Sequence, residues 1–198
     1  HAEGIDLMEL RYAPTFIQDG HEHMSFDEIH AGILDGLKAS SHLPVKVGLI
    51  AIFQRIKPIK VAENVLDFVL NHKDTFVGVD LADNEDGFEP RPFEPLFAKA
   101  KANGLRITVH AGEAPIASAA DNVRIAIDRL HAERIGHGLQ IANPEIPRSR
   151  ETLEYVAKSG VLLEICPTSN VLTNAVPSVA AHPLPKLRQA GVKVSINT

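Results

Sequence analysis

Short apolar runs alternate with amphipathic stretches along the whole chain. Seven runs of mostly aliphatic side chains predict strands at residues 5–14, 45–53, 76–81, 105–109, 134–138, 161–166 and 192–196. Between them, apolar side chains at helical spacing predict helices at about residues 25–40, 61–72, 93–103, 118–131, 150–159 and 184–190. Ser25 is the predicted N-cap residue of the first helix. The chain is therefore expected to be a regular succession of strand and helix.

The predicted strands are mostly apolar on both faces, which is typical of a parallel sheet covered by helices. No glycine-rich phosphate turn follows the first strand, and this disfavours a doubly wound sheet that binds a dinucleotide. We therefore predict an α/β fold of the (β/α)8 TIM-barrel type. The seven strands would correspond to about strands 2 to 8 of that barrel.

Both ends of the chain interrupt this pattern. Residues 1–4 read as the end of a helix, and no helix follows the last predicted strand before Thr198. We interpret residues 1–198 as a single barrel domain that is truncated at both ends. We therefore expect a further strand before His1 and a continuation beyond Thr198.

Composition narrows the possible partners and the location. With 44% hydrophobic residues the chain can bury a sizeable core, and its net charge of −5 comes from interspersed residues without a basic block. This argues against nucleic acid and anionic membranes as partners. No apolar run is long enough to cross a bilayer and no signal-peptide pattern opens the chain, so we expect a cytoplasmic protein. Cys166 is the single cysteine, which excludes an internal disulfide, and we interpret it as a buried, unreactive thiol.

Residues 106–113 end abruptly in chemistry-bearing side chains. An apolar strand leads directly to His110, Gly112 and Glu113. Barrels of this type place their active sites at the carboxyl ends of the strands. His110 can serve as a metal ligand, and Gly112 lets the backbone turn so that Glu113 faces the same pocket. A structural histidine held by hydrogen bonds is the alternative that this stretch alone leaves open.

Other predicted strands also end in polar residues. The ends comprise Asp80 to Glu85, His137, Glu164 to Asn170, and Asn197 with Thr198. Each position taken singly could simply be a polar loop residue. Because the ends of parallel strands converge on one face of a barrel, we expect these groups to share one site.

Four of these segments carry a specific resemblance. Residues 108–113 (Thr-Val-His-Ala-Gly-Glu), 134–138 (Arg-Ile-Gly-His-Gly), 164–170 (Glu-Ile-Cys-Pro-Thr-Ser-Asn) and 195–198 (Ser-Ile-Asn-Thr) resemble the motifs of the adenosine deaminase family, in the family's order. The resemblance covers essentially the whole chain. It implies a metal-dependent hydrolase barrel with one zinc ion, which hydrolyses adenosine and 2′-deoxyadenosine to the inosine product and ammonia in purine salvage. The implied ligand is a small purine nucleoside, without an obligate protein partner.

The resemblance also implies roles for individual residues. His110 would be a zinc ligand, Glu113 the proton donor to purine N1, and His137 the residue that orients the attacking water and helps deprotonate it. The zinc ion makes hydroxide available near neutral pH. Addition at C6 breaks the aromaticity of the ring unless N1 takes a proton, so Glu113 must carry one.

Four further residues fall at family site positions. Glu164 and Ser169 lie where the family has groups that hold the catalytic histidine and the metal-side aspartate, although both could equally be polar residues that end a strand. Gly112 and Asp83 lie at substrate-binding positions. Asp83 stands where the family commonly has a glycine whose backbone N–H contacts the purine, and its bulk, charge and preference against positive φ leave the substrate preference open.

The family's remaining zinc ligands are not found in this sequence. The His-x-His pair at the end of the first barrel strand and the aspartate after Ser-Ile-Asn-Thr are both missing. His21 and His23 form a His-x-His, but they lie in the loop after the first predicted strand and are expected to face solvent. No lysine occurs in residues 80–85, which favours one metal over the lysine-bridged pair of binuclear relatives.

Other polar residues receive structural interpretations. Glu9 and Arg11 are expected to form an ion pair or hydrogen-bond network in the barrel wall. The remaining histidines are expected to lie at the surface or to cap helices: His1, His30, His42, His72, His131 and His182. Two alternatives to an adenosine deaminase remain, namely a deaminase of adenine or of a modified adenosine, and a noncatalytic barrel relative that has lost its metal.

Overall fold

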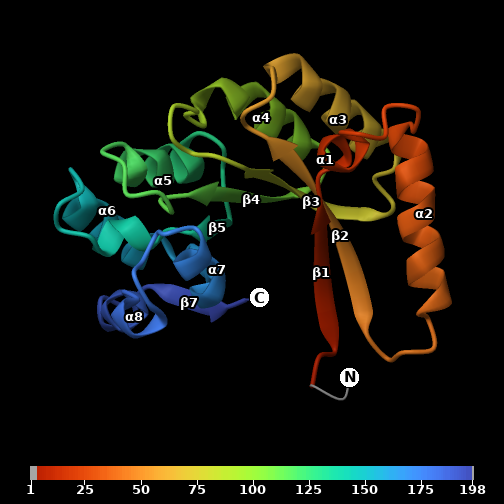
Figure 1. Ribbon diagram of the computed structural model, residues 1–198. Helices are drawn as coiled ribbons and strands as arrows, with labels where there is room; N and C mark the ends of the chain where they lie inside the picture. The colour runs from red at the N-terminus through yellow and green to blue at the C-terminus, as the bar shows by residue number, and fades with distance from the viewer. Residues whose placement is uncertain (1–3, 198) are drawn as a thin grey trace.

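In the computed structural model, seven strands form one sheet in which every strand runs parallel to its neighbours in chain order (Figure 1). The structure describes residues 4–197. His1, Ala2, Glu3 and Thr198, on which the predicted chain ends depend, lie outside the described residues. The strands are β1 (Leu7–Tyr12), β2 (Lys46–Gln54), β3 (Phe76–Ala82), β4 (Arg106–Ala111), β5 (Arg134–His137), β6 (Leu162–Ile165) and β7 (Lys193–Ile196). All seven predicted strands are confirmed, with ends that lie within two residues of the prediction.

Helices cover the outer side of this curved sheet (Figure 1). The helices of the structure are α1 (Pro14–Gln18), α2 (Phe26–Ala39), α3 (Ile59–Asn71), α4 (Glu94–Ala102), α5 (Ala119–Asp128), α6 (Ser149–Ser159), α7 (Pro167–Leu172) and α8 (Leu184–Gln189), with 3-10 turns η1 (Arg91–Phe93), η2 (Leu139–Ala142) and η3 (Val179–Ala181). Of these, the short α1 and α7 directly follow the carboxyl ends of β1 and β6. Ser25 caps α2 in a capping box with Glu28, as its N-cap prediction requires. The architecture is that of a partial (β/α)8 barrel, as predicted.

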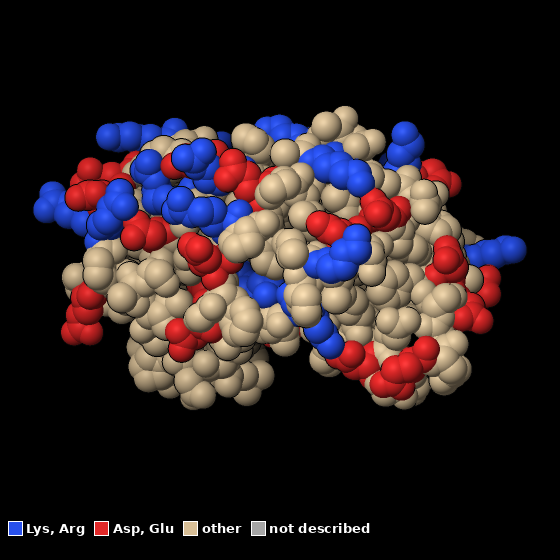
Figure 2. Space-filling model, turned by 90° about the horizontal axis from the view of Figure 1, so that it is seen from above, with Lys and Arg blue, Asp and Glu red and all other residues tan. Residues whose placement is uncertain are grey.

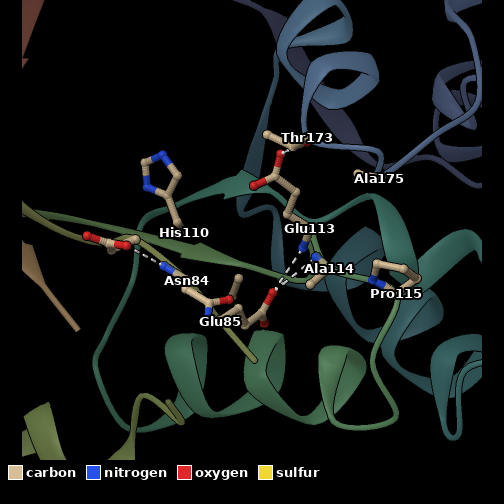
Figure 3. A pocket seen from close by; sticks show the side chains of 10 residues that line it. Asn84, Glu85, His110, Glu113, Ala114, Pro115, Thr173 and Ala175 are labelled. Carbon is tan, nitrogen blue, oxygen red and sulfur yellow. Dashed lines mark hydrogen bonds between the residues drawn. The ribbon is translucent and has the colours of Figure 1, made fainter. Parts of the chain in front are cut away.

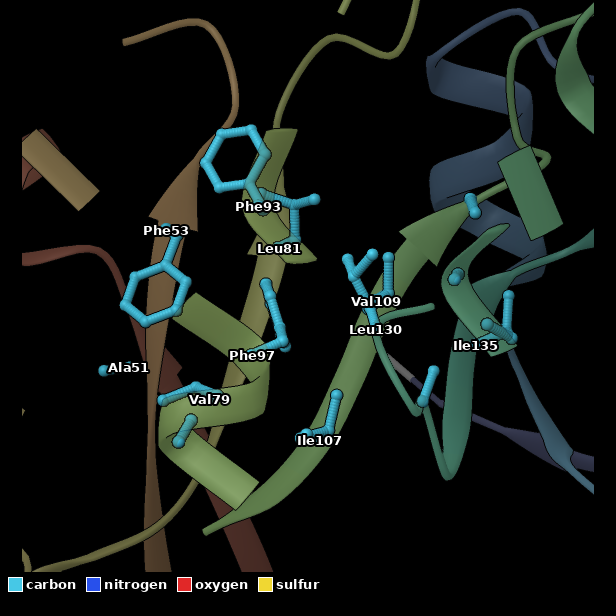
Figure 4. Close-up of a cluster of buried hydrophobic side chains, with 14 of the residues drawn as sticks. Ala51, Phe53, Val79, Leu81, Phe93, Phe97, Ile107, Val109, Leu130 and Ile135 are labelled. Carbon is cyan, nitrogen blue, oxygen red and sulfur yellow. The ribbon is translucent and has the colours of Figure 1, made fainter. Parts of the chain in front are cut away.

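The main core lies between the strands and the outer helices (Figure 4). Phe53 of β2, Leu81 of β3 and Val109 of β4 are fully buried there, together with Phe97 of α4. Each such side chain contributes roughly 1.5–3 kcal/mol by leaving water. Because this packing uses the apolar residues along the strands, the polar residues at the strand ends remain available for a site.

An ionic network on the inner side shows how far the sheet curves. Arg11 of β1 binds Asp80 of β3 (2.9 Å) and Glu164 of β6 (2.6 Å). Arg134 of β5 binds the same Glu164 (3.1 Å) and also contacts Glu9. β1 and β6 are not neighbours in the sheet, so these contacts cross the interior of the curved sheet. The predicted network around Glu9 and Arg11 is confirmed.

The histidines outside the site are only partly as predicted. His21 and His23 are exposed, as expected. His30 is 1% exposed and its ring bonds the hydroxyls of Tyr12 and Thr75, both at 2.9 Å, so its interpretation as a surface residue is wrong. His182 is also buried, although its ring accepts the Leu184 N–H at the start of α8. A helical pattern places a histidine on a face but does not tell what packs over that face.

The surface carries both charge signs side by side. Figure 2 shows Lys and Arg gathered on the side of α5 and α6, interspersed with Asp and Glu. Arg148 pairs with Asp121 at 2.7 Å and Arg124 with Asp128 at 3.3 Å. Within the described part of the chain, no helix is long and apolar enough to cross a membrane.

Candidate active site

A cavity of about 360 Å³ opens where β3 and β4 end (Figure 3). The residues that line it are Asp83, Asn84, Glu85, His110, Ala111, Glu113, Ala114, Pro115, Thr173 and Ala175. His110 and Glu113 therefore share one cavity, which the β4 motif led us to expect. The polar ends of β3 and β4 converge with the segment that follows α7.

His110 is held by a buried carboxylate. Its Nδ1 lies 3.0 Å from Oδ1 of Asp80, which is itself fully buried and bound to Arg11. Burial opposes the charged form of His110, but the charge and the hydrogen bond of Asp80 together outweigh it and raise the pKa of His110. In turn, burial raises the pKa of Asp80, but the charges of His110 and Arg11 prevail and lower that pKa to about 2. Since Asp80 engages Nδ1, Nε2 is the ring nitrogen left for a ligand.

The ring of His110 packs against the backbone of β5. His110 pairs with Gly136 in the parallel register, and a Cβ on Gly136 would lie only 2.8 Å from Cγ of His110. From the other side, the guanidinium of Arg55 at the end of β2 donates to the backbone carbonyl of His110. Both the ring and the main chain of His110 are thus fixed by neighbouring strands.

The turn after β4 presents Glu113 and is bound by one buried carboxylate. Glu85 accepts the backbone N–H groups of Gly112 (2.8 Å), Glu113 (3.1 Å) and Ala114 (3.4 Å), as well as the amide of Asn122 (2.9 Å). Gly112 has φ of +70°, and a Cβ there would lie 2.7 Å from Val123. Gly112 thus makes the sharp turn that the sequence suggested, with its own N–H already engaged by Glu85.

Replacing Glu85 with glutamine is expected to lower the free energy of unfolding by about 1–3 kcal/mol. One carboxylate oxygen becomes an NH₂ group that faces N–H donors of the turn, so buried donors lose their acceptor. Chemical denaturation measures the change. Glu89→Gln is the matched control, because its side chain in the same loop is 59% exposed. A loss below about 0.5 kcal/mol in Glu85→Gln would contradict this role of the carboxylate.

His137 lies behind Glu113, buried at the end of β5. Its Nε2 is 3.3 Å from Oε2 of Glu113, and its ring centroid is 5.1 Å from that of His110. Burial, and secondarily the charge of His110, lowers the pKa of His137 to about 4. The structure therefore brings together the three residues to which the resemblance assigns the chemistry.

Glu164 on β6 and Ser169 on α7 are the two residues to which the resemblance assigns holding roles, and those roles stay predictions. Glu164 is buried but contacts Arg11 and Arg134, and Ser169 is partly buried on α7. Among residues 4–197, the groups that hydrogen-bond Glu113 and His137 here are Asn170 and Thr173 rather than Ser169. Asn170 is adjacent to Ser169 and fully buried, which no sequence pattern revealed.

Cys166, at the start of the same segment, is a free, partly buried thiol. Burial, and to a lesser extent the charge of Glu164, raises the pKa of the thiol. A raised pKa keeps the sulfur protonated and weakens it as a nucleophile. This supports the interpretation of Cys166 as unreactive.

Asp83 adopts the backbone conformation that its position demands of a glycine. Its φ is +86°, in the left-handed region, and its carboxylate accepts from Gln54 Nε2 (2.9 Å) and from the Asn84 N–H (2.8 Å). Aspartate tolerates this region better than most residues because its side chain can bond locally. The substitution therefore keeps the turn and adds an exposed negative charge to the cavity.

The described residues supply one clear position for a metal ligand. His110, backed by Asp80 at Nδ1, has the arrangement that metal-binding histidines commonly show. Between residues 4 and 197, no group of three or more His, Cys, Asp or Glu side chains is arranged to hold a metal ion. The imidazole of His110 is thus suited to bind a zinc ion, and it would be one ligand of that ion.

Comparisons with known proteins show which family the chain resembles. The family model described as "Adenosine deaminase" matches residues 1–198. The chain is 36% identical over 201 residues to an adenosine deaminase of Plasmodium falciparum, covering 100% of this chain and 53% of that protein. An adenine deaminase structure from Arthrobacter aurescens superposes with a TM-score of 0.86 at 31% identity, covering 99% of this chain and 57% of that one.

A more distant structure extends the range of substrates among similar proteins. The N6-methyl-AMP deaminase of Arabidopsis thaliana superposes with a TM-score of 0.80 at 25% identity, covering 98% of this chain and 56% of that one. The chain spans about half the length of the curated relatives it matches.

Proposed function

The chain belongs to the adenosine deaminase family, and from this premise we propose that the protein carrying it deaminates adenosine and 2′-deoxyadenosine hydrolytically, releasing ammonia, in purine salvage. The observation that carries the proposal is that His110 and Glu113 line one cavity and that His137 lies directly behind Glu113. A metal ligand, an acid and a second imidazole within a few ångströms are the groups that addition of water to a purine ring needs.

Each residue has a distinct task in this proposal. His110 would hold one zinc ion per chain through the ring nitrogen that Asp80 leaves free. A zinc ion bound there supplies Lewis acidity and makes hydroxide available near neutral pH. Glu113 would give its proton to purine N1 while water adds at C6. The C6–N bond then breaks, and the amino group leaves as ammonia with the proton that the water has lost. His137, 3.3 Å from Glu113, would orient the attacking water.

The character of the cavity supports an uncharged nucleoside as substrate. Asp83, Glu85 and Glu113 line it, and none of its ten lining residues in the described part is Lys or Arg. A phosphate would meet carboxylates without a compensating cation, which disfavours a nucleotide. Adenine is the second candidate, because an adenine deaminase structure resembles this chain with a TM-score of 0.86.

A substrate panel tests the proposal. Ammonia release is followed with adenosine, 2′-deoxyadenosine, adenine, N6-methyl-AMP and AMP, and zinc is measured on the same preparation. We expect the largest kcat/KM for adenosine and about one equivalent of zinc. Faster turnover of adenine than of adenosine would refute the choice of substrate. Less than about half an equivalent of zinc together with no deamination would indicate a noncatalytic relative.

A further inference from the structure

We propose that Asn170 and His182 are positioning residues that set the tautomer of His137 and the orientation of Glu113. Neither residue lines the cavity, and both are buried behind it. The inference rests on the proposed function only in one respect, namely the roles of Glu113 and His137 in the reaction. The arrangement itself follows from a chain of hydrogen bonds whose direction is fixed at one end.

The fixed end is a backbone amide at the start of α8. The Leu184 N–H lies 3.0 Å from Nδ1 of His182, and a backbone N–H can only donate. Nδ1 of His182 is therefore an acceptor without a proton, and the ring proton sits on Nε2. Burial lowers the pKa of His182, which also favours the neutral ring.

The proton on Nε2 of His182 in turn fixes the orientation of the Asn170 amide. Nε2 of His182 is 3.1 Å from the side chain of Asn170, and because it donates, Asn170 must turn its Oδ1 toward it. The NH₂ group of Asn170 consequently faces the site. Turned the other way, the amide would bring two donors together at His182 and set its oxygen against the carboxylate of Glu113.

The two N–H bonds of Asn170 meet one acceptor each. Nδ2 is 3.0 Å from Oε1 of Glu113 and 2.9 Å from Nδ1 of His137. Thr173 donates to the same Oε1 at 2.8 Å. Oε1 of Glu113 thus accepts both hydrogen bonds, and the second oxygen, Oε2, faces His137.

The tautomer of His137 follows. Its Nδ1 accepts from Asn170 and carries no proton, so in the neutral ring the proton lies on Nε2, 3.3 Å from Oε2 of Glu113. The chain from Leu184 through His182 and Asn170 to His137 therefore selects the ring nitrogen that shares a proton with Glu113. An element distant from β4 and β5 in sequence controls the geometry of the acid and the imidazole.

Histidine tautomers test this directly. Long-range 1H–15N correlation spectra of the protein labelled with 15N-histidine separate protonated from unprotonated ring nitrogens. We expect both His137 and His182 to carry the proton on Nε2, with signals assigned by their loss in His137→Gln and His182→Gln. A proton on Nδ1 of either ring would overturn the proposal.

Substitutions at His182 separate positioning from mere structure. His182→Leu removes the donor to Asn170 and is expected to lower kcat by about 10- to 100-fold with KM within about threefold. His182→Gln places an amide N–H near the position of Nε2 and is expected to restore kcat to within about threefold of the wild type. Asn170→Asp, which sets a carboxylate against Glu113, is expected to lower kcat at least as far as His182→Leu.

The outcomes distinguish this inference from the proposed function. If no substrate is deaminated but both histidines show the expected tautomer, the proposed function fails and the hydrogen-bond chain stands. If deamination occurs and His182→Gln is as damaging as His182→Leu, the positioning role is refuted. Melting temperatures of all variants are compared, and should His182→Leu fail to fold, the wild-type tautomers decide.

Discussion

Replacing Glu113 with glutamine is expected to lower kcat for adenosine by about 10²- to 10⁴-fold and to leave KM within about threefold. Glutamine has nearly the same shape, and its Oε1 can still accept from Asn170 and Thr173, which lie 3.0 and 2.8 Å from the carboxylate. It cannot give up a proton to purine N1. Binding is therefore retained while the chemical step loses its acid. Steady-state kinetics of ammonia release measure the effect.

The control for this variant is Glu151→Gln, on the outer helix α6, where the side chain is 73% exposed. It removes the same charge from the protein without touching the cavity. Its kcat should remain that of the wild type. A decrease of less than about tenfold in a folded Glu113→Gln protein would exclude Glu113 as the proton donor.

The strands could be predicted from sequence because their side chains are apolar on both faces. Residues 45–53 and 76–81 are nearly unbroken apolar runs, and both form strands whose ends lie within one residue of the prediction. The short helices α1 and α7, of five and six residues, were not predicted, because each directly follows a strand and offers at most two turns of helical spacing. Helix α5 ends at Asp128 rather than near residue 131, because the chain turns back toward β5 with Ala132 N–H bonded to Ala126.

The candidate site was predictable only to the extent that its residues end strands. His110, Glu113 and His137 follow β4 and β5 directly, so the convergence of parallel strands placed them. The groups that hold them come from far along the chain. Glu85 reaches Asn122, 37 residues away, and Asn170 reaches Glu113, 57 residues away. No local pattern encodes such contacts, since they depend on how the strands and loops pack in space.

Gly136 makes such a contact between different strands, and its replacement by alanine is expected to disable the site. A Cβ would lie 2.8 Å from Cγ, 2.9 Å from Nδ1 and 3.0 Å from Cδ2 of His110. The ring cannot stay there, and its 3.0 Å bond to Asp80 would be lost. Such overpacking costs about 1–3 kcal/mol of stability. A displacement of about 1 Å can lower kcat/KM by about 10²-fold.

Zinc content, kcat/KM and chemical denaturation are measured together on Gly136→Ala, and all three are expected to fall. The matched control is Gly32→Ala on α2, where a new Cβ meets no atom within 4 Å and alanine is expected to gain about 0.5–1 kcal/mol. Gly136 is not one of the described glycines with a positive φ, so alanine causes no backbone strain there. The effect of Gly136→Ala therefore reports the contact with the His110 ring alone. If Gly136→Ala kept its zinc and its kcat/KM within about threefold, the position of the His110 ring against β5 would not matter for the reaction. The proposal that His110 is the metal ligand would then be wrong.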